Sequence, residues 1–144
     1  MGGALHGPAL HHPRTHIMIL KRPRGYRWRK GFARLRADWQ AQVRYILVLQ
    51  WPGDSEADFD ALISMEEQVD AALGRYAYVD GHDFGSDEMN IFIETDRPTE
   101  AFADAANALR EGPRWGDLRA AYREARGGPY EILWPQSLRK FSVK

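Results

Sequence analysis

The stretch from Asp80 to Asn90 brings together more reactive side chains than any other part of this chain. It contains His82, the only histidine after residue 16, and four carboxylates: Asp80, Asp83, Asp87 and Glu88. An imidazole beside a carboxylate can act as a base, and grouped carboxylates suit a hard divalent cation, for which the candidate ligands are His82, Asp83 and Asp87. The same Gly, Asp and Ser residues are also typical of a reversing loop.

Four interpretations of this stretch stay open. It is a structural turn, a surface that binds a ligand or protein partner, a metal site, or the site of a small enzyme that uses His82 with a nearby carboxylate. Asn90 favours the binding surface, because strand alternation should point it toward a sheet face that an apolar residue would normally occupy. We therefore expect a non-catalytic binding module without a cofactor. No P-loop, dinucleotide fingerprint, HExxH helix, EF-hand loop or nucleophile elbow occurs in the chain.

Extended segments flank this stretch. Residues 43–51 are apolar on both sides of an extended chain. Residues 89–95 alternate Met89, Ile91 and Ile93 with Asn90, Phe92 and Glu94, so both segments predict central strands. Residues 75–80 give a weaker strand pattern. A loop over residues 81–87 is expected to join this strand to 89–95 as a hairpin.

Two helices are expected between and after these strands. Ser55 and Asp58 have the spacing of a capping box ahead of an apolar stripe with helical period, and Gly74 is a natural stop for that helix. A second helix should begin after Asp96, with Pro98 in its first turn.

Residues 115–125 fit both helical spacing and strand alternation. We favour a strand, because residues 126–129 then form a turn into another strand at 130–134. Strand, helix, hairpin, helix, strand is the order of ferredoxin-like β-α-β-β-α-β folds. The sequence therefore predicts an α+β sandwich with a four-stranded antiparallel sheet, two helices on one face and an extra C-terminal strand. Residues 135–144 are expected to form a surface tail, with a short paired stretch at 141–143.

The predicted topology leaves one face of the sheet without helices. We expect that face to be largely apolar and aromatic, with Ile46, Val48 and Phe92 at its centre. Tyr76 or Tyr78 should join them from one edge and Tyr122 or Trp134 from the other, and we assign Tyr78 and Trp134 to the binding set. Such a surface is usually covered, and a homodimer is our preferred cover, with the chain's own termini or a small ligand as alternatives. The predicted binding set joins these residues to those of the polar stretch: His82, Asp83, Asp87, Glu88 and Asn90.

The first 40 residues differ from residues 41–144, which we assign to the folded domain. Residues 1–37 contain nine of the 20 Lys and Arg residues and none of the 20 Asp and Glu residues. This arm is predicted to be disordered, to pack on the acidic body, or to lie upstream of the true start. Its mixture of basic and aromatic residues also suits a membrane surface, a targeting peptide or nucleic acid, the last through Arg24, Arg27, Trp28, Arg29 and Lys30.

The composition excludes several classes of site. With no cysteine among its 144 residues, the chain has no disulfide, thiolate metal site or thiol nucleophile. This suits a reducing compartment. No apolar run approaches the roughly 18 residues needed to span a bilayer, so we expect a cytoplasmic protein.

Three short stretches resemble small stand-alone bacterial proteins of uncharacterised function with a ferredoxin-like core. They are residues 79–86, residues 88–93, and Ile132-Leu133-Trp134-Pro135. The similarity covers about residues 42 to 143, and it implies no activity. Pro52-Gly53 is also similar to a turn of ACT regulatory domains, which bind amino acids between subunits. Dimeric α/β-barrel monooxygenases share the element order, but no catalytic motif of theirs occurs here.

Overall fold

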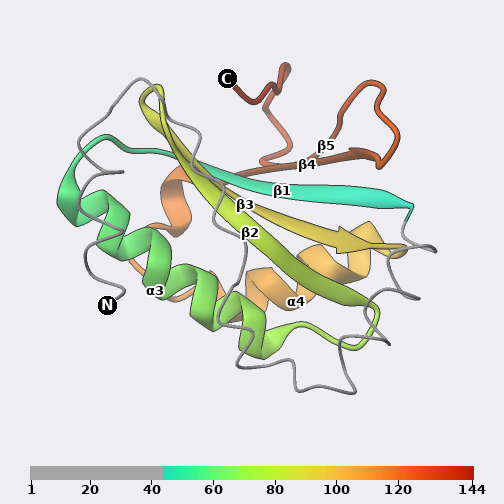
Figure 1. Ribbon diagram of the computed structural model, residues 1–144, viewed down its shortest axis with the longest axis horizontal. Helices are drawn as coiled ribbons and strands as arrows, with labels where there is room; N and C mark the ends of the chain where they lie inside the picture. Colours follow the sequence, from blue (N-terminus) through green and yellow to red (C-terminus); the bar gives the residue numbers. More distant parts are fainter. Residues whose placement is uncertain (1–43) are drawn as a thin grey trace, which may run out of the picture.

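The computed structural model describes residues 44–144, so the predicted arm and its candidate nucleic-acid-binding residues lie outside the described part. Two helices lie on one face of an antiparallel sheet (Figure 1). The described elements are β1 (Tyr45–Pro52), α3 (Glu56–Ala72), β2 (Ala77–Gly85), β3 (Glu88–Thr95), α4 (Pro98–Leu109), the short 3-10 helix η2 (Trp115–Asp117), β4 (Arg119–Glu124) and β5 (Glu131–Trp134).

The sheet order is β2-β3-β1-β4-β5, with every neighbouring pair antiparallel. The prediction that the first and third strands lie side by side in the interior is confirmed, because β1 pairs with β3 along its whole length. These strands are the most apolar in the sequence. Each of them has a hydrogen-bonded strand on both sides, so neither lies at an edge of the sheet.

The core lies between the sheet and the helices. Alternate residues of β1 and β3 point into it, including Leu47, Leu49, Ile91 and Ile93, all fully buried. Side chains from both helices meet them there: Leu62, Met65, Val69, Ala101, Ala105 and Leu109. Both amphipathic stripes therefore pack on the same face, as the sequence pattern predicts.

Helix α3 begins at the predicted capping box. Ser55 Oγ accepts the backbone N–H of Asp58, and Asp58 Oδ2 accepts the backbone N–H of Ser55. Asp58 also forms a 2.7 Å ion pair with Arg114. The backbone amide of Asp54, the Arg114 guanidinium and the amide of Ser55 hold the pKa of Asp58 well below its usual range.

Replacing Asp58 with alanine should lower the free energy of unfolding by about 1–2 kcal/mol at neutral pH, since it removes half of the capping box. Because the folded pKa is depressed, this stabilisation is present above the ordinary value of 3.8 and is lost as the pH falls below it. Urea unfolding of both proteins at several pH values measures this. A difference that grows in acid would contradict the assignment.

The predicted turn at residues 126–129 and the strand after it are confirmed: Gly127 and Gly128, both with φ near +120°, turn the chain so that β5 pairs with β4. The sheet therefore has five strands, one more than the four-stranded core that was predicted. One prediction about the sheet is wrong. The expected loop at residues 81–87 is reduced to Ser86 and Asp87, both with positive φ, and β2 continues to Gly85. Pairing with β3 keeps the polar residues 81–85 extended although their composition favours a loop.

Candidate functional site

The extension of β2 separates the side chains that were predicted to act together. His82 pairs with Ile91 and points toward the helices, whereas Asp83 pairs with Asn90 and points to the opposite face. A bulge between Val79 and Gly81 sets this alternation. Because neighbouring strand residues point to opposite faces, His82 and Asp83 do not converge on one site. Asp87 is exposed in the turn between the strands.

His82 forms a buried pair with Glu66 of α3. Its Nδ1 lies 3.2 Å from each carboxylate oxygen of Glu66, and the two side chains are only about 5% and 6% exposed. A carboxylate accepts hydrogen bonds, so Nδ1 carries a proton and donates it. In the neutral ring this leaves Nε2 as an acceptor. Nε2 is itself buried, and no atom of the described part of the chain is its hydrogen-bond partner.

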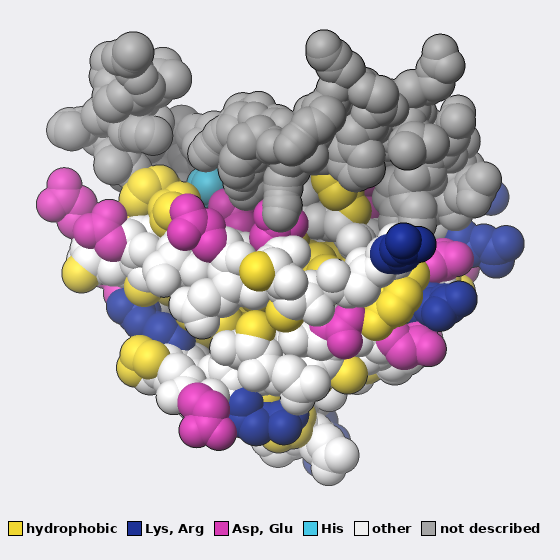
Figure 2. Space-filling model, turned by 90° about the horizontal axis from the view of Figure 1, so that it is seen from below, with side chains coloured by type: hydrophobic (Ala, Val, Ile, Leu, Met, Phe, Trp, Pro, Cys, Tyr) yellow, Lys and Arg dark blue, Asp and Glu magenta, His cyan; other side chains and the backbone are white. Residues whose placement is uncertain are grey.

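Aromatic rings pack around this pair. The ring of Phe59 in α3 packs edge-to-face on two rings, with centroid distances of 5.9 Å to His82 and 5.4 Å to Phe84. We call the set of His82, Glu66, Phe59 and Phe84 the β2–α3 margin, since β2 is an edge strand of the sheet. Figure 2 shows hydrophobic and acidic side chains close together on one face of the described residues.

A second polar cluster lies on the sheet face without helices. Gln50, Glu88 and Asn90 come from the two central strands, and all three are at least 95% buried. Asn90 Nδ2 donates to Asp83 at 2.8 Å and to Glu88 at 3.2 Å, while Gln50 Nε2 donates to Asn90 at 3.0 Å. The expectation that Asn90 points to this face is confirmed by its partners. Its role there is to hold two carboxylates.

The C-terminal tail covers this polar cluster. Gln50 Nε2 donates to the carbonyl oxygen of Ser142 at 3.0 Å, and the backbone N–H of Lys144 donates to Glu88 at 2.9 Å. Phe141 packs on Tyr130 with ring centroids 4.9 Å apart. The tail thus crosses the face from β5 toward β3, on the side away from the helices (Figure 1). The predicted paired stretch at residues 141–143 does not form a strand.

Asp83 provides a test of the polar cluster. Burial raises its pKa above the ordinary value, and the charge of Glu88 adds to this, whereas the hydrogen bond from Asn90 opposes it. A raised folded pKa means that stability falls as the pH rises from 3.8 through the folded value. Asp83→Asn should therefore raise the free energy of unfolding at pH 7, and this gain should vanish below the ordinary pKa. Urea unfolding against pH measures both. A loss of stability at neutral pH would contradict the prediction.

The remaining predicted binding residues divide between the two faces. Ile46, Val48, Tyr78 and Phe92 share the open face, since Ile46 and Tyr78 both pair with Glu94 and Val48 pairs with Phe92. Trp134 does not join them. It pairs with Ala120 and packs against Trp115, so it belongs with the helix-side residues. The irregular pairing of β4 with β5 makes its orientation hard to predict from the sequence.

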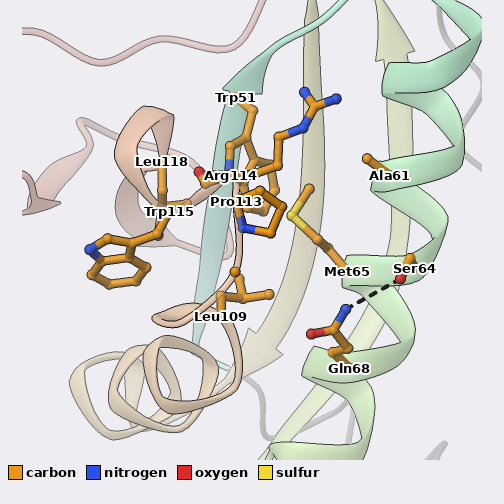
Figure 3. A pocket seen from close by; sticks show the side chains of 11 residues that line it. Trp51, Ala61, Ser64, Met65, Gln68, Leu109, Pro113, Arg114, Trp115 and Leu118 are labelled. Carbon is orange, nitrogen blue, oxygen red and sulfur yellow. Dashed lines mark hydrogen bonds between the residues drawn. The ribbon is translucent and has the colours of Figure 1, made fainter.

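A small hollow lies elsewhere, between α3 and the connection from α4 to β4 (Figure 3). Its volume is about 150 Å³, and Trp51, Met65 and Leu109 are among its lining residues. The polar side chains on its wall have partners, because Arg114 pairs with Asp58 and Gln68 donates to Ser64. None of the predicted site residues lines it.

Sequence reasoning missed Glu66 and Gln50, and it named the chain's termini only as one alternative cover of the open face. Glu66 was detectable, because it lies on the same helical face as Phe59 and Val69, where an apolar residue is expected. Gln50 lies on the same face of β1 as Ile46 and Val48, because the three residues are two positions apart. The tail's hydrogen bonds to Gln50 and Glu88 use backbone atoms, so side-chain types there do not reveal them. In the described range, no three His, Asp or Glu side chains are grouped to hold a metal ion.

Comparison with protein families, curated proteins and solved structures finds no match to this chain. The resemblance to small bacterial proteins stays a prediction. The structure itself defines the class as an α+β protein with two helices on one face of a five-stranded antiparallel sheet. None of the helices at residues 44–144 combines the length and the apolar character that crossing a membrane requires.

Proposed function

We propose that this chain is a binding module whose partner is a cationic, hydrogen-donating ligand or peptide at the β2–α3 margin. One observation carries the proposal: Nε2 of His82 is buried and has no hydrogen-bond partner among residues 44–144, while Glu66 holds Nδ1. A buried polar atom without a partner costs free energy, which a donor from a bound molecule would recover.

The chemistry around His82 favours a donor-rich partner. Neutral imidazole Nε2 accepts hydrogen bonds, and carboxylates do the same. Helix α3 carries six acidic side chains and no basic one. Guanidinium and ammonium groups combine positive charge with several donors, so they match such a surface better than a neutral or acidic molecule.

The distribution of charge over the whole fold points to the same class of partner. Residues 54–96, which include α3, β2 and β3, contain 13 acidic residues and a single basic one, Arg75. Residues 97–144 contain nine basic and six acidic residues. A cationic partner is therefore attracted to the α3 half of the molecule and repelled from the other half.

The finer assignments of fold and location are also proposals. Strand order β2-β3-β1-β4 supports a ferredoxin-like fold that β5 extends by one strand. The absence of cysteine supports a cytoplasmic location. A homodimer through the open face would use its apolar end at Ile46 and Phe92, because Val48 is already fully buried and the tail covers the polar end. Sedimentation equilibrium of the full chain tests that dimer, and a monomer at all concentrations would reject it.

A nona-arginine peptide is a direct probe of the proposed function. When the full chain is titrated with it at low salt, the NMR resonances that shift should cluster at His82, Phe59 and neighbouring residues of α3 and β2. His82→Phe should weaken binding about 5- to 10-fold, because it keeps an aromatic ring at this position but removes the Nε2 acceptor. The matched control, Glu100→Gln in the first turn of α4, should bind as the parent protein does.

A neutral peptide of nine serines serves as the control peptide. It should leave the resonances of the margin unshifted, since it carries no charge to pair with an acidic surface. Shifts confined to β4, β5 or the tail on adding nona-arginine would reject the proposal. So would equal affinity for the two peptides, because charge would then play no part.

One observation favours a second function, catalysis by His82 as a general base. A carboxylate on Nδ1 with Nε2 left as acceptor is the arrangement of a base with its orienting acid. Such a base must be reached by a substrate, so diethyl pyrocarbonate should modify His82 in the folded protein. Mass spectrometry measures this, and the four histidines of residues 1–16 are internal controls. An unmodified His82 beside fully modified controls would reject catalysis.

A further inference from the structure

We infer that the resident occupant of the β2–α3 margin is the chain's own basic segment, residues 21–36, docked in cis. This inference rests on the proposed function, because it assigns a specific partner to the same site. It makes binding of an external cationic partner a competition with the arm. The arm then acts as a built-in inhibitor of the module.

Charge complementarity is the first argument. Residues 21–36 contain eight basic residues and no acidic one. The surface they would meet is α3, whose carboxylates include the exposed Asp60 and Glu67. Because both partners are parts of one chain, their effective concentration is in the millimolar range for a short linker, so weak contacts suffice to keep the segment docked.

The composition of the segment also fits the apolar part of the margin. Tyr26, Trp28 and Phe32 alternate with its basic residues. The margin presents half-buried Phe59 and Phe84 beside His82. Aromatic side chains pack on such rings edge-to-face, while guanidinium groups donate to carboxylates and to an imidazole acceptor. A segment with basic residues alone would pair with the carboxylates of the margin but would leave its aromatic rings without a packing partner.

The chain is long enough to make the contact. In the sheet, His82 lies four residue positions along β1 and two strands across from Tyr45, since Leu49, Ile91 and His82 are in register. This corresponds to a separation of about 16 Å at standard strand spacings. The residues between 36 and 45 span up to about 30 Å when extended. The segment can therefore reach the margin of its own fold.

Carbodiimide coupling of the full chain tests the docking. Lys21 and Lys30 are the only lysines of the arm, and the reagent joins a lysine to a carboxylate with which it is in contact. At low salt, peptide mapping should find these lysines joined to carboxylates of α3, foremost Asp60, Glu67 and Asp70. In about 0.5 M salt these products should fall at least fivefold, because exposed charges are screened.

Two charge-neutralised variants sharpen the test. Asp60→Asn with Glu67→Gln should reduce coupling to the remaining α3 carboxylates at least threefold. The matched control, Glu100→Gln with Glu111→Gln, removes the same charge from exposed positions in and after α4 and should leave the α3 products unchanged. Equal reductions by both variants would overturn the inference, because attraction would then depend only on net charge.

Other outcomes also decide the matter. Arm lysines coupled mainly to Glu100, Glu111 or Glu124 would overturn the docking site. Products that join a 15N-labelled copy to an unlabelled copy would overturn docking in cis. Replacement of the eight basic residues of the segment by glutamine should raise the affinity for nona-arginine at least tenfold. If this variant binds nona-arginine at the margin with the same affinity as the parent chain, the inference alone is rejected. If neither the variant nor the parent chain binds nona-arginine, the proposed function is rejected as well.

Discussion

Replacing Trp51 with alanine should lower the free energy of unfolding by about 3–5 kcal/mol, the largest effect that we expect from a single substitution. Trp51 is 1% exposed at the end of the central strand β1. Its indole packs in the core, and Nε1 donates to the carbonyl oxygen of Arg114 at 3.1 Å. Truncation would leave a cavity next to the hollow at α3 and would also leave that carbonyl without its donor.

Trp51→Phe separates these two contributions. Phenylalanine keeps most of the apolar volume but has no N–H, so it should cost about 1–2 kcal/mol. Urea unfolding followed by circular dichroism measures both variants. A Trp51→Ala protein within 1 kcal/mol of its Trp51→Phe counterpart would contradict the central position that the structure gives to this side chain, since the cavity term would then be negligible.

Replacing Asn90 with alanine should lower the free energy of unfolding by about 2–4 kcal/mol. The side chain donates to Asp83 and Glu88 and accepts from Gln50. Because the region is buried, removing the amide leaves two carboxylates short of a donor and one amide short of an acceptor. The penalty for these groups exceeds the loss of the small apolar area of the side chain.

The tail offers a matched control for this experiment. Ser142 contributes its backbone carbonyl to Gln50, so Ser142→Ala should change the free energy of unfolding by less than about 0.5 kcal/mol. Removing residues 141–144 should cost about 1–3 kcal/mol, because the contacts to Gln50, Glu88 and Tyr130 are lost together. An Asn90→Ala protein as stable as the parent would show that the polar cluster does not hold the sheet face together.

Local patterns predicted the elements well where several signals agreed. The capping box at Ser55, the start of α4 at Pro98 and the pairing of β1 with β3 are all as predicted. Apolar periodicity and terminal residues act within a few positions of each other, so a single sequence contains them. The extra strand was predicted less directly, and residues 81–87 were assigned to a loop because glycine and aspartate there outweighed a weak alternation.

The candidate site could be predicted only in part. His82 and Asn90 were singled out for good reasons, but the sequence grouped them in one polar stretch, whereas the pairing of β2 with β3 places them on opposite faces of the sheet. Glu66 is 16 positions from His82, and Gln50 is 40 positions from Asn90. Contacts over such separations depend on how helix and sheet pack, so no local pattern reveals them.

The sequence by itself determined the α+β class, the two amphipathic helices, the apolar central strands of the sheet and the division of charge between residues 1–37 and the rest of the chain. Each of these follows from spacing or composition along the chain. Only the tertiary structure decided that His82 is buried against Glu66, that Asn90 holds two carboxylates and that the tail covers them. These depend on strand register and packing, which bring together residues that are distant along the chain.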